Sequence, residues 1–186
     1  MRSSTTSLSL RPVTRLAIAL PRYGGLVSEG SAPRPAILVS ACLLGVRCNH
    51  LGRASPSVAV ARLAADHDLV PICPEVAGGL PVPRPAAELG PDGTVRTGDG
   101  DDVTTAYRGG AASAVAAARA AGARRAVLKA RSPSCGCGQV YDGTFTRTLV
   151  GGDGVAARAL RDAGLAVCSD EDVEAEGVGG PAGGPL

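Results

Sequence analysis

The chain has 186 residues, which is enough for one domain with a sizeable hydrophobic core. Hydrophobic residues make up 45% of it but aromatic residues only 2%, so alanine, valine and leucine have to build that core. The formal net charge of +2 is too small for charge alone to indicate binding to nucleic acid. A membrane span is not expected, because no run of about 18 apolar residues is present.

The two ends of the chain differ in composition from the middle. Residues 1–35 are rich in serine, threonine, arginine and proline, with no acidic residue before Glu29, so we predict a disordered extension there. A transit peptide has a similar composition and is the less favoured interpretation. Residues 175–186 are rich in glycine and proline, which is typical of a flexible tail, and this leaves residues 36–174 as the folded domain. Because the apolar stretch Leu16 to Leu20 is too short for the core of a signal peptide, we expect a cytoplasmic protein.

Four short apolar runs have the composition of buried strands. They cover residues 36–41, 69–73, 125–131 and 165–168. Between the second and third runs, the segment 74–103 is rich in proline and glycine and predicts a long loop.

Helical patterns separate these runs. Ser55 can N-cap a first helix with Pro56 at its first position. An alanine-rich helix is expected from about Thr104 to Ala121, and a third helix begins after Asp153 and ends at Gly164. Strands that alternate with helices predict a single α/β domain with a mostly parallel, Rossmann-like sheet flanked by helices.

Three of the predicted strands have a cysteine at or after their carboxyl end. Cys42 comes directly after the first strand, Cys73 ends the second, and Cys135 lies in the small-residue loop after the third. The carboxyl ends of parallel strands lie along one edge of a sheet, where open α/β sheets bind their ligands. We therefore expect the three cysteines to converge at that edge.

Cysteines in a reducing cytosol more often bind metal or catalyse than form disulfides. Three thiolates are one short of a closed tetrahedral zinc site, but they suit a [4Fe–4S] cluster. Three protein ligands leave one iron free to act as a Lewis acid toward a substrate. The alternative is that small buried cysteines fill an alanine-rich core, and the spacing alone does not decide between the two.

Six motifs carry a resemblance to a known family. They are CLLGVRCN at 42–49, CPEVAGGL at 73–80, PRPAAE at 83–88, DVT at 102–104, SPSCG at 132–136 and YDGTF at 141–145. Together they resemble the bacterial thiouracil desulfidase (TudS-like) family, formerly known only as a domain of unknown function. The resemblance covers about residues 36–172, in order. It implies a [4Fe–4S] cluster held by Cys42, Cys73 and Cys135. The chain departs from the pattern at Asn49-His50-Leu51-Gly52, where many members have Arg-Tyr-Asp-Gly, so no role of that tyrosine or aspartate is carried over.

Three polar residues near these cysteines are candidate catalytic groups. Glu75 follows Cys73 by two residues and is a candidate base for activating water, although an ion pair with Arg84 is an equal alternative. Ser132 and Ser134 precede the third cysteine and can hydrogen-bond the cluster sulfurs or the substrate, or only complete the turn.

Three other residues are candidates for substrate binding. Lys129, the only lysine, can offset cluster charge or hold an anionic substrate, and Arg84 is a second cation. Tyr141, one of only four aromatic residues, offers the flat surface that a pyrimidine ring needs. We expect Glu88 to pair with Arg84, and Asp142-Gly143 to form a turn before any catalytic role.

Three cysteines remain without a role. Cys48 and Cys137 lie near the proposed site in sequence, and Cys137 is interpreted as a neighbour of the cluster, with ligation as an alternative. Cys168 ends the fourth strand, where a core thiol is expected.

The sequence and the resemblance together predict an iron–sulfur-dependent desulfidase. It would release hydrogen sulfide from a thiolated pyrimidine, as a base or a nucleotide, by hydrolysis and without net redox change. The alternative is a non-catalytic iron–sulfur or zinc module for redox sensing or sulfur delivery. A cysteine-nucleophile hydrolase is a third possibility, but no Cys–His pairing is visible among only two histidines. A small-molecule partner is expected, with no membrane association and no nucleic-acid partner.

Overall fold

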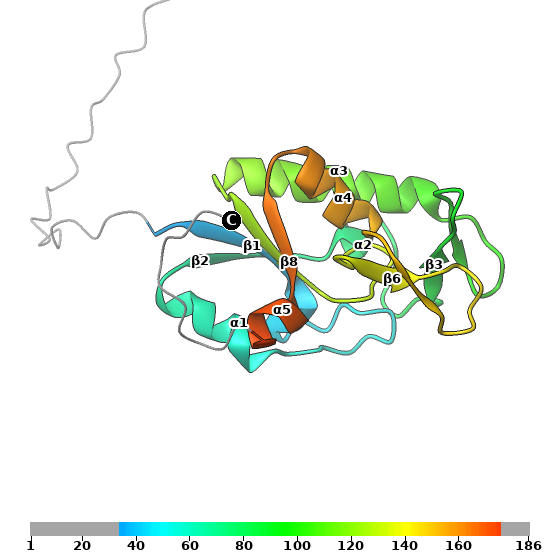
Figure 1. The fold of residues 1–186 in the computed structure, drawn as a ribbon, viewed down its shortest axis with the longest axis horizontal. Coiled ribbons are helices and arrows are strands. Elements are labelled where there is room, and N and C mark those ends of the chain that lie inside the picture. The colour runs from blue at the N-terminus through cyan, green and yellow to red at the C-terminus, as the bar shows by residue number, and fades with distance from the viewer. Residues whose placement is uncertain (1–33, 176–186) are drawn as a thin grey trace, which may run out of the picture. The chain divides into compact units, whose positions relative to one another are not determined.

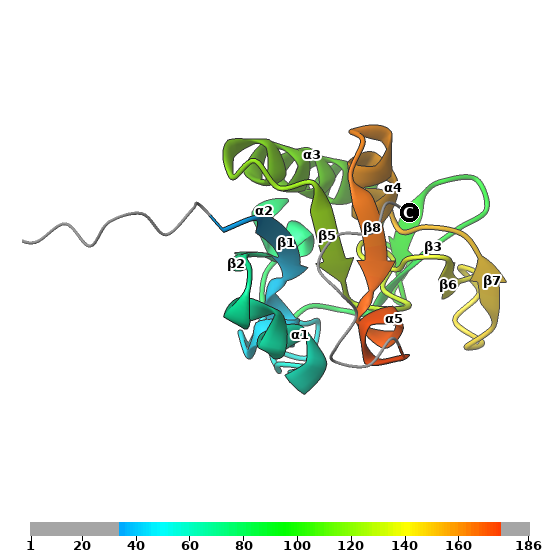
Figure 2. The same ribbon diagram turned by 60° about the vertical axis from the view of Figure 1, so that its left-hand side comes forward.

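A parallel sheet of four strands runs through the part of the chain that the structure describes, residues 34–175 (Figure 1). In this computed structural model the strand order is β2-β1-β5-β8, and all neighbouring pairs are parallel. Figure 2 shows the arrows of β1, β5 and β8 pointing the same way. The strands are β1 Ala36–Ser40, β2 Asp68–Ile72, β5 Arg125–Leu128 and β8 Ala166–Ser169. The predicted α/β fold with a parallel sheet is confirmed.

The third predicted strand is three residues too long, because side chains replace the sheet ladder beyond Leu128. The backbone N–H of Lys129 donates to the hydroxyl of Ser40 at 2.9 Å. The next N–H, of Ala130, donates to the carboxylate of Asp170 at 2.7 Å. These two bonds turn the chain out of the sheet at the edge where the cysteines were expected.

Helices cover both faces of the sheet (Figure 1). One layer holds α3 Thr104–Ala120 and α4 Val155–Asp162, and the other holds α1 Val58–Arg62, the 3-10 turn Leu63–Ala65 and α5 Asp170–Ala175. Successive residues of β1 point to opposite faces. Leu38 packs with Ala114 on the first side, and Val39 packs with Val60 and Val173 on the second. The two longer predicted helices are confirmed.

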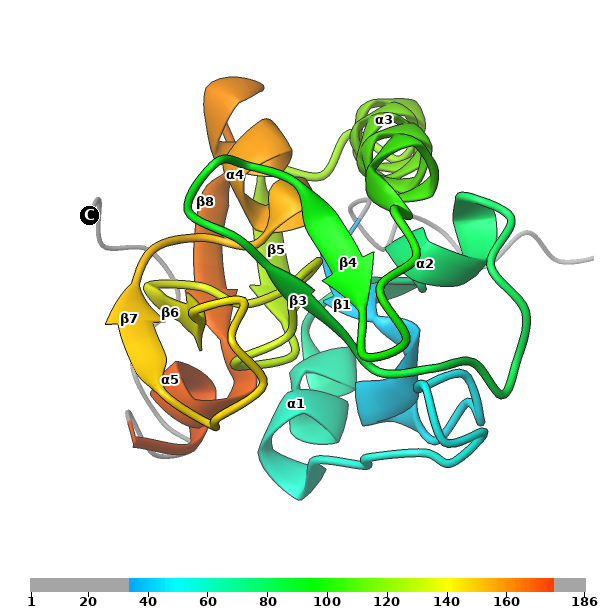
Figure 3. The same cartoon turned by 90° about the vertical axis from the view of Figure 1, so that its right-hand side faces the viewer.

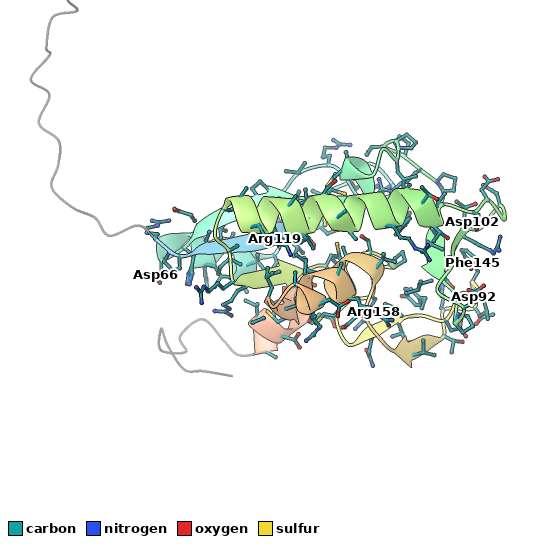
Figure 4. The ribbon with its side chains drawn as sticks, turned by 90° about the horizontal axis from the view of Figure 1, so that it is seen from above. Asp66, Asp92, Asp102, Arg119, Phe145 and Arg158 are labelled. Atoms are coloured by element: carbon teal, nitrogen blue, oxygen red, sulfur yellow. The ribbon has the colours of Figure 1, made fainter. Side chains whose placement is uncertain are left out.

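Small side chains on the inner side of the α3–α4 layer let it lie close to the sheet. Ala114 and Ala118 of α3 are fully buried, and so is Ala157 of α4. The layer's outer side carries charge, with exposed Arg119 on α3 and Arg158 on α4 (Figure 4). Alanine and valine thus supply the core that the scarcity of aromatic residues requires.

The N-cap predicted for the first helix is wrong. Ser57, not Ser55, is the N-cap of α1, and its hydroxyl accepts the backbone N–H of Val60 at 3.3 Å. The N–H of Ser55 is bonded to the carbonyl of Cys42, and that of Ser57 to the carbonyl of Leu43. These bonds hold the segment extended against the turn that follows β1.

The segment 74–103, predicted as a long loop, contains three short elements. They are α2 Pro74–Ala77, β3 Ala87–Leu89 and β4 Val95–Thr97. A second hairpin, β6 Gln139–Tyr141 and β7 Leu149–Gly151, contains the predicted turn at Asp142-Gly143. Figure 3 shows the two hairpins side by side in front of the sheet. Elements of three or four residues leave no periodicity that a sequence pattern can detect.

Two glycines let α2 approach α3 to backbone contact. A Cβ at Gly110 of α3 would lie 1.9 Å from the carbonyl oxygen of Pro74, and one at Gly78 would lie 2.0 Å from that of Ala106. Real Cβ atoms do not approach this closely. The short helix α2, which follows Cys73, therefore packs against the backbone of α3, because neither glycine has a side chain in the way.

The predicted tails, 1–35 and 175–186, lie almost entirely outside the described residues. The described residues belong to one compact unit. None of the helices within 34–175 combines the length and the apolar character needed to cross a membrane.

Candidate functional site

A cavity of about 610 Å³ opens at the carboxyl edge of the sheet. Cys42, Cys73 and Cys135 all line it, so the structure brings together the three cysteines that follow strands β1, β2 and β5. Cys48 lines the same cavity. Four of the chain's six cysteines therefore face one space.

Cys42 and Cys73 are positioned by tight turns that follow their strands. Cys42 lies in the 3-10 turn Ala41–Leu44, which ends at Gly45 with φ of 91°. Its carbonyl accepts the N–H of Ser55 at 2.9 Å. Cys73 is the N-cap of α2, and its sulfur lies 3.6 Å from the carbonyl oxygen of Cys48. Each thiol thus comes from a backbone fixed by hydrogen bonds.

Cys135 is held by a loop that folds onto Ser132. The hydroxyl of Ser132 accepts the N–H groups of Ser134 and Cys135 at 3.1 and 3.0 Å. The N–H of Gly136 donates to the carbonyl of Ser132 at 2.7 Å, and a Cβ at Gly136 would lie 2.7 Å from that same oxygen. The carbonyl of Ser134 accepts two N–H groups from the start of α4. The loop therefore has one conformation, with Cys135 buried.

Burial keeps these thiols protonated. Loss of solvation, with the neighbouring Cys73, raises the pKa of Cys42 to about 11. The same two causes raise the pKa of Cys48 to about 12. Burial raises the pKa of Cys135 well above its usual range, although a hydrogen bond from Ser40 opposes the shift. Binding iron would displace the protons from such thiols.

The part of the cavity wall formed by these cysteines fits an iron–sulfur cluster, because thiolates are the protein ligands that such clusters prefer. Soft thiolate donors select iron–sulfur clusters, copper or zinc over hard cations. Within residues 34–175, no three His, Cys, Asp or Glu side chains are gathered tightly enough to hold a single metal ion.

Glu75 and Arg84 form a buried ion pair in the cavity wall. The Arg84 Nε lies 2.7 Å from the carboxylate of Glu75, and the two side chains are only 5% and 12% exposed. Ser132 also donates to Glu75, at 3.4 Å. The remaining Arg84 nitrogens donate to the carbonyls of Cys48 at 3.1 Å and Pro81 at 3.2 Å. The ion pair that was the alternative reading of Glu75 is therefore present.

Tyr107 of α3 faces the same carboxylate. The residue is 2% exposed and lines the cavity. Burial and then the charge of Glu75 raise the pKa of Tyr107 far above its usual value, so its hydroxyl stays protonated and hydrogen-bonds the carboxylate. Glu75 is thus surrounded by donors from Arg84, Ser132 and Tyr107.

Comparison with known proteins agrees with this geometry. The sequence model of a family described as 2-thiouracil desulfurase matches residues 37–172. The chain belongs to the 2-thiouracil desulfurase family. It is 40% identical, over 146 residues, to the uncharacterized protein YbbK of Bacillus subtilis (strain 168), covering 74% of this chain and 97% of YbbK. Among solved structures it resembles the [4Fe–4S]-dependent thiouracil desulfidase TudS, with a TM-score of 0.71 and 40% identity over 76% of this chain and 95% of that one.

In this member of the 2-thiouracil desulfurase family, Lys129 and Tyr141 both line the cavity, as a substrate-binding role requires. Lys129 is not free, because its Nζ lies 2.5 Å from the carboxylate of Asp170, whose side chain is only 7% exposed. Tyr141 reaches the cavity from β6. Asp170 was missed by the sequence reasoning, although its position directly after the fourth strand places it at the same sheet edge.

Two sequence-based expectations are corrected. Glu88 does not pair with Arg84, because its carboxylate accepts the N–H groups of Gly143 and Phe145 at 3.1 and 2.9 Å and so joins the two hairpins. Ser134 is fully buried and is not among the residues lining the cavity, and its hydroxyl has no partner within residues 34–175.

The remaining two cysteines, Cys137 and Cys168, are not among the residues that line the cavity. The sulfur of Cys137 accepts a bond from Arg161 at 2.7 Å and donates to the carbonyl of Val167 at 3.3 Å. Its interpretation as a neighbour of the cluster stays a prediction, because its side chain packs against the core cluster that contains Cys135. Cys168 packs against the core and donates to the carbonyl of Ala126, as a core thiol was expected to.

Proposed function

We propose that this protein is a [4Fe–4S]-dependent desulfidase that removes sulfur from a thiolated pyrimidine by hydrolysis, without net redox change. The observation that carries the proposal is the meeting of Cys42, Cys73 and Cys135 in one cavity at the carboxyl edge of the sheet. Membership of the 2-thiouracil desulfurase family and the similarity to a thiouracil desulfidase structure support it.

The same three cysteines would hold the cluster, since each has a fixed backbone and a sulfur in the cavity wall. When bound with three protein ligands, such a cluster supplies a Lewis-acidic iron with affinity for a soft sulfur atom. The lysine at the cavity wall, Lys129, would offset part of the cluster's negative charge. Its pairing with Asp170 fixes the position of that positive charge.

Glu75 is the proposed base that takes a proton from the attacking water. It lines the cavity two residues from Cys73, and Arg84 and Ser132 fix its carboxylate. Water then contributes the oxygen of the product's carbonyl, and the sulfur leaves as hydrogen sulfide. Because Arg84 donates to Glu75 and to the carbonyls of Cys48 and Pro81, we assign it to holding Glu75 in place of direct substrate contact.

Substrate recognition is assigned to residues that line the same cavity. Tyr141 offers an aromatic face for a pyrimidine ring, and Ser132 lines the same cavity. A cavity of about 610 Å³ is within the usual range for a small-molecule site. We propose that the protein acts in the cytoplasm on a small thiolated pyrimidine, and the net charge of +2 does not favour a nucleic-acid substrate.

Anaerobic purification followed by a sulfide-release assay tests the proposal. We expect a brown protein with broad absorbance near ~400 nm, as iron–sulfur clusters show. It should release sulfide from at least one member of a panel of thiolated bases, nucleosides and nucleotides. A coloured protein that releases sulfide from no member would favour a sensor or sulfur-delivery module, and a colourless zinc protein would contradict the proposal.

Single substitutions test the proposed cluster ligands and the proposed base independently. Cys42→Ala, Cys73→Ala and Cys135→Ala should each lose iron and colour, whereas Cys168→Ala, the core-thiol control, should keep both. Glu75→Gln should keep the cluster and lower turnover by roughly 10²–10⁴-fold, the usual contribution of a general base. Equal iron in all four cysteine variants would refute the ligand assignment, and unchanged turnover in Glu75→Gln would exclude the base.

A further inference from the structure

The cavity contains one cysteine more than the proposed cluster requires. Cys48 is 6% exposed and lines the cavity together with Cys42, Cys73 and Cys135. It lies in the loop between β1 and α1, where its N–H donates to the carbonyl of Val46 at 2.9 Å. Neither the proposed ligand set nor the proposed hydrolysis uses its thiol.

Cys73 is in contact with Cys48. The Cys73 thiol donates to the carbonyl oxygen of Cys48 at 3.6 Å, and both sulfurs line the same cavity. Arg84 holds the Cys48 backbone in place, because its Nη2 donates to that same carbonyl at 3.1 Å. The Cys73 sulfur therefore lies beside the Cys48 backbone, and the two thiols share one cavity.

The thiols also differ in their access to solvent. Cys73 is half-buried, whereas Cys42, Cys48 and Cys135 are buried. A dissolved disulfide can therefore reach Cys73 before the others, and Cys48 is the neighbouring thiol that can then displace it. Thiol–disulfide exchange proceeds through such a mixed disulfide, and access to the sulfur controls its rate.

We propose that Cys48 and Cys73 form a reversible disulfide when the cavity holds no cluster. The oxidant is a low-molecular-weight disulfide of the glutathione type. The thiolate of Cys73 attacks it, forming a mixed disulfide and releasing one small thiol. The thiol of Cys48 then attacks the Cys73 sulfur, and its proton passes to the second small thiolate as that thiolate leaves. Two protein thiols are oxidised, one small disulfide is reduced, and the two departing thiolates take up the two protons.

The disulfide would act as a gate on cluster loading. This consequence rests on the proposed function, because it requires Cys73 to be a cluster ligand. With Cys73 bonded to Cys48, only Cys42 and Cys135 of the proposed ligands remain. The cavity would then accept no cluster until a thiol reductant reopens it. Cofactor loading would thereby depend on the thiol redox state around the protein.

Mass spectrometry on the full-length protein tests the disulfide without any activity measurement. The protein is freed of iron with a chelator under anaerobic conditions, exposed to oxidised glutathione and then alkylated. Two of the six cysteines should become unreactive, and digestion should yield one cross-linked peptide pair containing Cys48 and Cys73. The Cys48→Ser variant should retain no such cross-link, and Cys168→Ser should behave like the wild type. Full alkylation of all six cysteines, or a Cys42–Cys73 cross-link, would overturn the proposal.

Iron uptake tests the gate. Oxidised wild-type protein given ferrous iron and sulfide should take up no iron until dithiothreitol is added, whereas Cys48→Ser should load without it. Cys48→Ala provides the same test if the serine is poorly tolerated. Equal loading of oxidised wild-type protein and Cys48→Ser would refute the gate. If the cross-link forms but the reduced protein never binds iron, the thiol pair stands and the proposed function fails.

Discussion

The contact between α2 and α3 can be broken by adding a single carbon atom. In Gly110→Ala the new Cβ would lie 1.9 Å from the carbonyl oxygen of Pro74 and 2.6 Å from its carbonyl carbon. Restoring an ordinary van der Waals distance requires α2 to move by roughly 1.5 Å. Because the obstacle is backbone and not a flexible side chain, no rotamer change relieves it. Overpacking of this kind costs about 1–3 kcal/mol.

The displacement also reaches the site, because Cys73 caps α2 and Glu75 lies within it. Misplacing a catalytic group by about 1 Å can reduce the rate by around 10²-fold. For a chain of this size each kcal/mol shifts the melting temperature by about 2–4 °C. We therefore expect Gly110→Ala to melt roughly 2–12 °C lower than the wild type and to turn over around 100-fold more slowly.

The neighbouring glycine of α3 is a matched control. Gly109 is exposed, and a Cβ there would meet nothing within 4 Å. Replacing a glycine inside a helix with alanine stabilises by about 0.5–1 kcal/mol. Gly109→Ala should thus melt roughly 1–4 °C higher with unchanged turnover. Thermal unfolding followed by circular dichroism, with sulfide release measured on the same preparations, compares the two. Equal melting temperatures in the two variants would refute the reasoning.

Three further predictions concern the cap, the ion pair and the thiols. Ser57→Ala should lower the free energy of unfolding, measured by urea titration, by about 0.5–2 kcal/mol. Ser55→Ala should lower it by less. A larger loss in Ser55→Ala would instead support Ser55 as the N-cap. Arg84→Met should lower the free energy of unfolding by about 3–5 kcal/mol, because it leaves Glu75 charged and buried. A double variant that also carries Glu75→Gln should recover part of that stability. No recovery would contradict the ion pair. Because burial raises the pKa of Cys42 to about 11, protons compete with iron below that pH. A chelator should therefore remove iron faster at pH 6 than at pH 9, and a rate independent of pH would argue against ligation by this thiol.

The sequence predicted the fold and the meeting of the three cysteines for a single physical reason. Apolar runs alternating with helical segments specify a parallel sheet, and a parallel sheet brings together whatever follows its strands. This reasoning placed Cys42, Cys73 and Cys135 correctly. It extends to Asp170, which follows β8 at the same edge.

The errors arose where side-chain hydrogen bonds or very short elements decide the structure. Ser55 and Ser57 are both acceptable N-caps by composition, and only the bonds of residues 55–57 to the turn after β1 select the second. Glu88 had Arg84 close in sequence, but Glu75 and two carbonyls already bind the guanidinium. Such competition between partners depends on tertiary structure, which local sequence does not reveal.

Turnover in ¹⁸O-labelled water tests the central claim most directly. Anaerobically purified protein is given a thiolated pyrimidine with no reductant and no dioxygen, and product and sulfide are measured together. Hydrolysis predicts one ¹⁸O atom in the carbonyl of each product molecule and one sulfide per turnover, with no electron donor consumed. An unlabelled product, or turnover that begins only when a reductant or dioxygen is added, would contradict hydrolytic desulfuration at this site.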